Sequence, residues 1–362
     1  MSRYFFYPVV LTMLINTIFY IPRIMIEERF NGAFMGILIS IPIGSLMAYL
    51  FVNAMSKFPG LGLPEILERN LVTALRIPIL SFLSVMWFIA GAIIIVSFSL
   101  ITERYVNPEI SKSLLLLFSV VVICWSSTRT SLAIINVLEI GLLLSIPFIM
   151  FISYKAMSHE MLDWDAIWTM SDYILRVPPW HTVSAATYLF TGYINLVLYN
   201  RFFKDTRVKH LWIIPIVGTL IFFTTIFLPI GMQGTQAVEE YIYVWISTAD
   251  AIRMEYGFIE RVLFLFLFLY IGLALLFVTM TWNVGLTLLR SCFRTLNHNK
   301  KRMAIFNWTV CGMMGGITLV FGAIVNEKQL IFISKQWFNI RFPIEILLVT
   351  LVVIISRRKN HA

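Results

Sequence analysis

Long apolar runs separated by short polar connections dominate the hydrophobic pattern of this chain. A helix needs about 20 mainly apolar residues to cross the hydrocarbon core of a bilayer. Ten runs of roughly that length lie near 4–26, 32–56, 77–102, 113–128, 132–154, 181–200, 210–230, 260–286, 304–325 and 338–356. The pattern predicts an all-α integral membrane protein of about ten transmembrane helices, with residues 1–362 forming a single transmembrane domain.

The composition agrees with a chain that lies mostly within lipid. Of its 362 residues 59% are hydrophobic and only 13% are charged, whereas a soluble domain carries roughly 25% charged residues. Too little polar surface remains to cover a separate soluble domain. The three cysteines lie within or at the ends of apolar runs and form no C-x-x-C pair, so we expect no metal or redox site at these residues.

The charges are distributed unevenly along the chain. If both termini are cytoplasmic, most Lys and Arg fall in inner segments such as 201–209, 290–302 and 357–359. Asp and Glu instead gather in the two longest outer connections, roughly 155–180 and 231–259. Because cytoplasmic loops carry an excess of Lys and Arg, the pattern predicts that orientation. The net charge of +9 is therefore an orientation signal, and no nucleic-acid binding is expected.

Both long outer connections also contain aromatic residues. Trp164 and Trp168 lie in the first, and Tyr241, Tyr243 and Trp245 lie in the second. Trp and Tyr are favoured at the membrane–water interface. These segments could form short helices at that interface, or they could cap a cavity, and the pattern leaves both interpretations open.

Motifs for catalysis or cofactor binding are missing from the sequence. None of the five histidines has another histidine three or four residues away, and no H-E-x-x-H, G-x-S-x-G or P-loop motif occurs. These patterns would supply a zinc site, an activated serine or a phosphate cradle. We therefore predict no enzymatic activity, no catalytic residues, no bound metal and no cofactor.

A few polar residues lie inside the apolar runs, where charges are expensive and tend to be functional. Glu139 lies in the fifth run, and Asn136 precedes it by one helical turn. They could form a structural or coupling element facing the bundle interior, or Glu139 could pair with Arg129 near the cytoplasmic boundary. Glu345 lies near the start of the tenth run, close to Arg341, where we expect local pairing.

Two runs contain residues that interrupt a helix. Asn16-Thr17 and Pro22 interrupt the first run, and Thr191-Gly192-Tyr193 interrupts the sixth. Breaks in corresponding spans of two halves are the best sequence indication of a midplane site, where freed N–H groups bind a carboxylate or a hydroxyl. With two further polar residues at midspan depth, the candidate ligand-binding residues are Asn16, Thr17, Tyr20, Ser97, Thr191, Gly192, Tyr193, Asn195 and Tyr270.

Three stretches resemble the spore germination permease family. Phe58–Glu68 (FPGLGLPEILE) resembles its P-G-x-x-L-x-E-x-x-E connection after the second helix. Thr130–Glu139 (TSLAIINVLE) resembles its G-x-E-x-x-A-R-x-x-E motif, with Asn136 in place of the usual Arg and Glu139 matching the final Glu. Phe258–Val262 (FIERV) is similar to its F-x-E-R-x-D signature, without the Asp.

That family is the membrane-spanning B subunit of nutrient germinant receptors in endospores of Bacillus and relatives, within the amino acid–polyamine–organocation transporter superfamily. The resemblance implies a five-plus-five inverted repeat, roughly 1–156 and 177–362, with helices 1 and 6 broken. It also implies sensing of a small amino acid, sugar or nucleoside in the spore inner membrane, together with an A subunit and a lipoprotein C subunit. The alternative is a secondary transporter of amino acids or amines coupled to protons or sodium, for which Glu139 is the only candidate ionisable group.

One departure from the family concerns the first helix. Family members often carry glycines before its Leu-Pro step, but Ile15–Pro22 (INTIFYIP) has none. Glycine allows a helix to unwind at little steric cost. Its absence argues against the usual way of holding a carboxylate, and the side chains of Asn16 and Thr17 could supply partners instead.

Overall fold

The computed structural model describes residues 3–18, 20–106, 109, 111–203, 208–253, 261–293 and 299–358, and within these ranges it contains no β-strand. The all-α prediction is therefore confirmed. The long helices are α3 (Ala33–Ser56), α5 (Thr73–Tyr105), α6 (Lys112–Ser127), α7 (Ser131–Met157), α14 (Val262–Arg290), α15 (Lys300–Ile324) and α16 (Glu327–Arg358).

The remaining helical elements are short. The α-helices are α1 (Arg3–Asn16), α2 (Tyr20–Glu27), α4 (Leu63–Asn70), α8 (Trp164–Trp168), α9 (Trp180–Tyr188), α10 (Leu196–Tyr199), α11 (Ile213–Phe222), α12 (Leu228–Gln233) and α13 (Val244–Ala251). Four 3-10 turns are η1 (Thr169–Tyr173), η2 (Thr191–Asn195), η3 (Asn200–Phe202) and η5 (Ala237–Glu240), and the π-helical turn η4 (Phe223–Phe227) joins α11 to α12.

The number of membrane spans differs from the ten that the apolar runs suggest. Within the described ranges, seven helices are long and apolar enough to cross a membrane, or eight if the bent pair α1–α2 is one span. The fourth run forms α6, which has only 16 residues. The sixth run is divided among α9, η2, α10 and η3. A count of ten is therefore not confirmed, because these two runs are too short or too broken to qualify by length.

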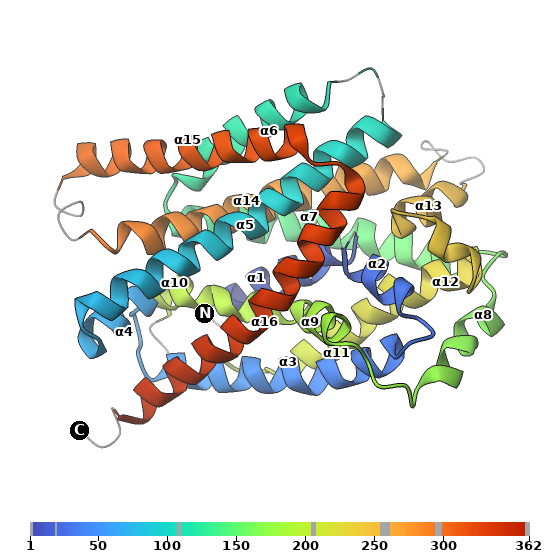
Figure 1. The fold of residues 1–362 in the computed structure, drawn as a ribbon, viewed down its shortest axis with the longest axis horizontal. Helices are drawn as coiled ribbons and strands as arrows, with labels where there is room; N and C mark the ends of the chain where they lie inside the picture. Colours follow the sequence, from blue (N-terminus) through green and yellow to red (C-terminus); the bar gives the residue numbers. More distant parts are fainter. Residues whose placement is uncertain are drawn as a thin grey trace.

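The long helices run mainly along the longest axis of the molecule (Figure 1). Helices α6 and α15 lie beside each other along one edge, α3 lies along the opposite edge, and α16 crosses obliquely. The short helices α8, α12 and α13 lie at one end, and α4 and the C-terminal end of α16 lie at the other. The chain thus folds into one helical bundle, and the connections between its long helices lie at the two ends of the bundle.

Small residues allow α5 and α14 to pack closely through the centre of the bundle. A Cβ on Gly285 would lie 3.0 Å from the Ser84 carbonyl oxygen, and one on Gly91 would lie 2.5 Å from the Trp282 indole nitrogen. The Ser84 hydroxyl also donates to the Gly285 carbonyl at 2.7 Å. Close backbone approach at small residues, combined with such interhelical hydrogen bonds, is how helices associate in lipid. This pair forms a rigid wall beside the cavity described below.

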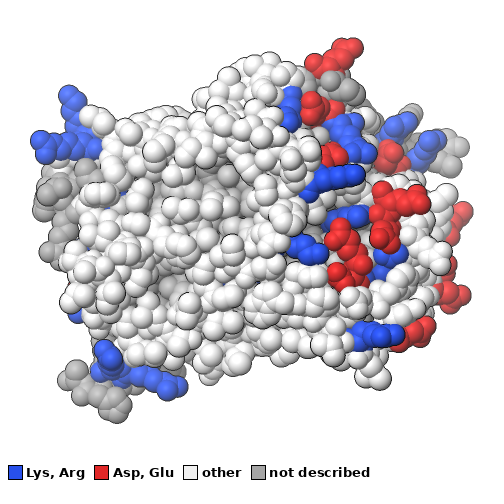
Figure 2. All heavy atoms as spheres, viewed as in Figure 1, with Lys and Arg blue, Asp and Glu red and all other residues white. Residues whose placement is uncertain are grey.

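One face of the molecule has a broad band that carries no charged side chain (Figure 2). On the face drawn in Figure 2, Lys and Arg occur at both ends, whereas Asp and Glu appear only at the end that carries α8 and α13. Large apolar side chains are exposed on the long helices, among them Phe118 of α6 at 64% and Phe268 of α14 at 71%. Hydrocarbon tolerates such a surface and excludes charges. The chain is an integral membrane protein.

The predicted breaks in helices 1 and 6 are both present. Helices α1 and α2 meet at an angle of 52° across Thr17 and Ile18. In the sixth run the α-helix stops at Tyr188, and the chain continues as turns through η2. Gly192 faces the backbone of α1 so closely that a Cβ there would lie 2.4 Å from the Val9 Cα atom. Only glycine permits this contact, so the break in the sixth run packs against the middle of α1.

Both long outer connections contain short helices, α8 in the first and α13 in the second, and Trp245 of α13 also lines a cavity. Within the second connection, Tyr243 donates a hydrogen bond from its hydroxyl to Glu327 at 2.8 Å, and Arg104 pairs with Glu327 at 2.7 Å. Burial, followed by the adjacent Glu327 carboxylate, raises the pKa of the Tyr243 hydroxyl above its ordinary value. These contacts hold α13 against the ends of α5 and α16. The segment 254–260, which includes most of the Phe258–Val262 motif, lies outside the described residues.

Candidate functional site

A cavity lies at the centre of the bundle, between α1, the broken sixth helix and helices α5, α14 and α16. Its volume is about 70 Å³, and because one water occupies about 10–15 Å³ by this measure, it holds roughly five to seven water-sized groups. The lining residues are Thr12, Leu83, Met86, Trp87, Ala90, Tyr188, Thr191, Ile194, Asn195, Phe277, Thr281, Trp337, Arg341, Ile344, Glu345 and Leu348. A cavity of this size suits a small solute.

A buried ion pair forms one wall of this cavity. Arg341 and Glu345 lie one turn apart on α16, pair through Nη1 and Oε2, and have side chains only 6% and 4% exposed. Arg341 also donates from Nη1 to the Thr191 hydroxyl at 2.8 Å, and from Nη2 to the Thr187 hydroxyl at 3.1 Å and to the Ser184 carbonyl oxygen. The guanidinium thereby connects α16 to the end of α9 and to η2.

Glu345 also forms hydrogen bonds with the broken sixth helix. It accepts a hydrogen bond from the Tyr193 hydroxyl at 2.6 Å and one from the Thr191 hydroxyl at 3.1 Å. A buried charge is tolerated only when it is paired and hydrogen-bonded, and both conditions are met here. The pairing of Glu345 with Arg341 was expected, but its position was not. Helix α16 begins at Glu327, so the pair lies near the middle of a long helix and not at its start.

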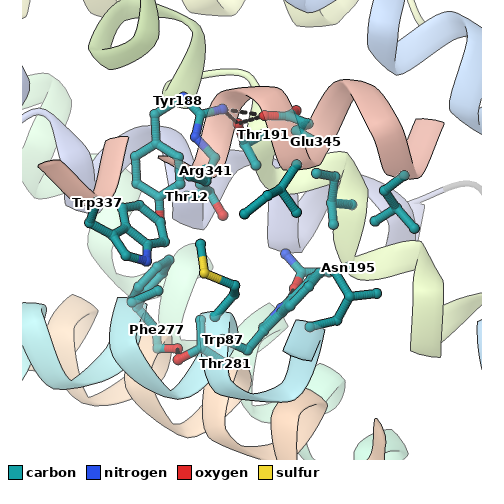
Figure 3. A pocket seen from close by; sticks show the side chains of 16 residues that line it. Thr12, Trp87, Tyr188, Thr191, Asn195, Phe277, Thr281, Trp337, Arg341 and Glu345 are labelled. Atoms are coloured by element: carbon teal, nitrogen blue, oxygen red, sulfur yellow. Dashed lines mark hydrogen bonds and ion pairs between the residues drawn. The ribbon is translucent and has the colours of Figure 1, made fainter. Parts of the chain in front are cut away.

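Two hydrogen-bond donors on this side of the cavity have no partner among the described residues. They are Nε of Arg341 and the indole nitrogen Nε1 of Trp337, and both are buried. Figure 3 shows the indole nitrogen of Trp337 on the cavity side of the ring, and Arg341 on the wall that also carries Thr191 and Glu345. A buried donor without an acceptor costs about 1–3 kcal/mol. The site therefore favours a ligand that brings acceptor oxygens.

On the opposite wall, most polar groups already have hydrogen-bond partners within the protein. The Trp87 indole donates to the Asn195 side-chain oxygen at 3.0 Å, and the Asn195 amide donates to the Gly192 carbonyl at 3.0 Å. The Thr281 hydroxyl donates to the Phe277 carbonyl at 3.0 Å. These groups present mainly apolar and aromatic surface to the cavity (Figure 3). The arrangement is an apolar pocket with a few convergent polar groups, which is typical of small-molecule sites.

The four candidates on the sixth helix take different positions. Thr191 and Asn195 line the cavity. Tyr193 is buried behind the wall, where it contacts Glu345. Gly192 does not line the cavity and packs against α1. Their roles in ligand binding stay predictions. Thr191 and Asn195 could contact a ligand directly, whereas Gly192 and Tyr193 could act only by fixing the shape of η2.

Three other candidates lie beside the cavity. Asn16 and Tyr20 line a separate small cavity of about 10 Å³, which also has Tyr188 and Trp337 in its wall. The Asn16 amide donates to the Thr12 carbonyl at 2.6 Å, while its side-chain oxygen is buried without a partner among the described residues. Ser97 lines neither space and shares a hydrogen bond with the Tyr20 hydroxyl.

Thr17 and Tyr270 lie farther from the ion pair. Thr17 lines a second cavity of about 70 Å³, in whose wall Trp245 of the outer connection also lies. Its hydroxyl donates to the Leu14 carbonyl at 2.6 Å. Tyr270 is buried against Phe98, with ring centroids 6.0 Å apart. The structure does not bring these two residues to the cavity that contains Arg341.

The polar pair on the fifth run is separated by the structure. Asn136 is exposed on the outer surface of α7, so the expectation that it faces the bundle interior is wrong. Glu139 is partly buried and accepts a hydrogen bond from the Tyr7 hydroxyl of α1 at 2.7 Å. Arg129, its expected partner, instead lies over the Trp125 ring at 4.3 Å. Asn136 and Glu139 are three residues apart, so their side chains lie on adjacent faces of α7 and not on the same face.

Trp87, Trp337, Arg341 and Glu345 are among the lining residues that the sequence pattern did not indicate as ligand-binding. A signal for the last two was present, because an Arg and a Glu spaced i, i+4 interrupt an otherwise apolar segment. Starting the tenth run at 338 placed this pair at a membrane boundary, where local pairing is unremarkable. The two tryptophans gave no signal, since aromatic residues are common throughout the chain.

Comparison with known proteins places the chain in a family. Residues 2–331 match the family described as spore germination protein, which has permease character. Arg341 and Glu345 lie beyond the matched residues. No curated protein matches the sequence significantly. Because the family match covers most of the chain and agrees with its helical membrane fold, the protein belongs to the spore germination protein family of permease-like membrane proteins.

Proposed function

We propose that this protein is the membrane subunit of a spore nutrient germinant receptor, which binds a small germinant in the central cavity and thereby triggers germination. The observation that carries the proposal is the Arg341–Glu345 pair, which borders the cavity and holds the broken sixth helix through Thr191 and Tyr193. Ionisable residues within membrane spans mark ligand and ion sites by default.

The cavity favours a small amino acid over a sugar or a nucleoside. A volume of about 70 Å³ has room for only roughly five to seven water-sized groups, which is close to the size of the smallest amino acids. A carboxylate would satisfy the free donors of Arg341 and Trp337. An ammonium group would be attracted by Glu345 and by the faces of the lining aromatic rings. The Arg341 side chain also supplies the carboxylate partner that a first helix without glycines does not offer.

Binding would be coupled to a change of shape through the same contacts. A ligand carboxylate on the free Nε of Arg341 adds a second anion to a guanidinium whose Nη1 already donates to Glu345 and Thr191, and so weakens both of these contacts. It thereby loosens the connection between α16 and η2 and favours a different arrangement of the bundle, which is a shift of population. We propose that an A subunit and a lipoprotein C subunit receive this shift in the spore inner membrane, with both termini of this chain facing the core.

Spores in which this protein is replaced by variants test the proposal. The double variant Arg341→Met, Glu345→Leu removes the pair without leaving an unpaired charge. Release of dipicolinic acid is followed after adding amino acids, sugars and nucleosides one at a time. We expect loss of the response to small amino acids only, with the variant present in normal amount by immunoblot.

Lys328→Gln is the matched control, because Lys328 is an exposed cation on the same helix. It should leave every response unchanged. Normal germination of the double variant with every nutrient would overturn the assignment of the site.

The second candidate function is a secondary transporter of amino acids or amines coupled to protons or sodium. It is favoured by Glu345, an ionisable group beside the cavity, which is better placed for coupling than Glu139. Reconstituted protein separates the two functions. Uptake of a labelled amino acid into liposomes that is lost in Glu345→Gln would support transport, and absence of uptake by a protein that restores germination in spores would support sensing.

A further inference from the structure

A long groove runs along the outside of the bundle between α6, α7 and α14. It has a volume of about 620 Å³ and shares no lining residue with the central cavity. Its walls are almost entirely apolar, and several wall residues are strongly exposed, including Leu144 at 66% and Phe268 at 71%. Since the bundle is surrounded by hydrocarbon, this groove opens into the lipid and not into water.

The groove has the length of one lipid leaflet. Along α7 it extends from Ala133 to Ser145, which is about 18 Å at 1.5 Å per residue. Half of the hydrocarbon core of a bilayer is about 15 Å. Gly272 of α14 forms part of the floor, and no atom lies within 4 Å of the place where its Cβ would be. The length of this space suits an extended acyl chain, and its volume is about 620 Å³.

A cation lies at one mouth of the groove. Arg129 lines it, is exposed, and has its guanidinium 4.3 Å from the centre of the Trp125 ring. Among the described residues no carboxylate forms an ion pair with Arg129. Trp residues favour the level of the lipid headgroups, so this mouth lies where a lipid phosphate would be.

The turn that carries Arg129 is held in place. Asn283 of α14 donates from its side-chain amide to the carbonyls of Ser127 at 2.8 Å and Arg129 at 3.1 Å. Nearby, Ser126 and Thr279 share a hydrogen bond of 2.7 Å across the floor of the groove. The cation and the groove are therefore parts of one fixed structure, and the position of the charge does not depend on a loose loop.

We propose that this groove is a binding site for one anionic phospholipid, with the lipid phosphate on Arg129 beside Trp125 and one acyl chain along α7 and α14. Charge complementarity favours a lipid over an apolar helix of a partner, because a helix would leave the guanidinium without an anion at the headgroup level. On the orientation proposed above, Arg129 faces the inner leaflet, where anionic lipids attract basic residues.

Lipid binding to the purified protein tests the proposal. The protein is incubated in detergent with phosphatidylglycerol or phosphatidylcholine, and bound lipid is counted by native mass spectrometry. We expect wild type to retain phosphatidylglycerol preferentially. Arg129→Gln should reduce that preference about fivefold, since one basic residue near a lipid surface contributes about 1 kcal/mol. Gly272→Leu, which fills the groove, should reduce retention of both lipids.

The controls make each result decisive. Lys328→Gln, an exposed cation on another helix, should bind lipid like wild type, and thermal unfolding of every variant checks that the fold is intact. Equal retention of both lipids by wild type and by Arg129→Gln would show annular lipid only and would overturn the proposal. If adding partner subunits displaces all bound lipid and also protects groove residues from chemical labelling, the groove is instead the binding site of a partner helix.

Discussion

At the scale of single residues, the buried pair on α16 is the least expected feature of the protein. Removing two charges from water costs several kcal/mol per ion, and a buried pair seldom contributes much net stability. Among the described residues, every hydrogen bond of Arg341 and Glu345 beyond their own pairing goes to the broken sixth helix. The pair therefore positions η2 against α16 at the wall of the cavity.

Removing only one member of this pair should be much worse than removing both. Arg341→Met leaves Glu345 buried without its cation, which costs about 3–5 kcal/mol. The double variant Arg341→Met, Glu345→Leu should recover most of that loss, since no charge is left unpaired. Thermal unfolding of purified protein in detergent measures the difference. Equal melting temperatures for the single and double variants would contradict this account of the site.

A second residue-scale prediction concerns Asn200 at the end of the broken helix. Its amide nitrogen donates to three carbonyls at and just after the C-terminal end of α3: Met55 at 3.3 Å, Phe58 at 2.8 Å and Leu61 at 2.8 Å. Asn200→Ala should lower the free energy of unfolding by about 1–3 kcal/mol, because buried carbonyls lose their donor. Asn70→Ala is the control, since Asn70 is exposed and donates once within its own helix. A larger loss for the control would contradict the prediction.

At the scale of elements, the central observation is that two interrupted helices contact each other. The first run bends between α1 and α2, and η2 of the sixth run packs directly on α1. A break inside a bilayer is tolerated only where protein or a cavity satisfies the freed backbone. Here α1, α16 and the cavity surround η2. The arrangement explains why the sequence can interrupt both helices without exposing backbone polar groups to lipid.

This contact predicts a specific sensitivity to side-chain size. Gly192→Ala would place a Cβ 2.4 Å from the Val9 Cα atom and 2.7 Å from the Pro8 carbonyl oxygen. Because both neighbours are backbone atoms, they cannot move aside cheaply, and we expect a loss of about 1–3 kcal/mol from overpacking. Gly312→Ala is the matched control, since no atom lies within 4 Å of its Cβ position. Removing a helical glycine there should be neutral or slightly stabilising.

Thermal unfolding and the response of spores to germinants should both change in Gly192→Ala. If the two glycine variants have equal stability, the packing of η2 on α1 is looser than the structure indicates.

At the scale of the whole molecule, two charged ends enclose an uncharged band. On the face shown in Figure 2, the acidic residues appear only at the end that carries the outer connections. The orientation stays a prediction at this scale, because the rule that marks the cytoplasmic side counts Lys and Arg and gives little weight to Asp and Glu. The organisation into two inverted repeats, roughly 1–156 and 177–362, stays a prediction at this scale.

Cysteine labelling tests the orientation directly. The three native cysteines are buried, so they should give little background. Glu160→Cys in an outer connection should react with a membrane-impermeant maleimide in intact cells that express the protein. Arg302→Cys at the start of α15, also at an exposed position, should react only after permeabilisation. The reverse pattern would place both termini outside.

The sequence by itself determined the fold class, the membrane location and the interruptions of the first and sixth helices. Each of these depends on local chemistry: runs of apolar residues must face lipid, and Asn, Gly and Pro weaken a helix wherever they lie. The family resemblance likewise rested on contiguous motifs. Thr191 and Asn195 could be chosen as cavity residues because they lie within a visible break.

Only the tertiary structure decided which polar groups meet. Arg341 and Glu345 are more than 140 residues from Thr191 and Tyr193 in sequence, and their contacts depend on how α16 crosses the bundle. The outward position of Asn136 and the separate cavity beside Thr17 were decided in the same way. The apolar pattern is nearly uniform around most of these helices, so it does not specify which face is turned inward. Packing between helices specifies the face, and with it the residues of the site.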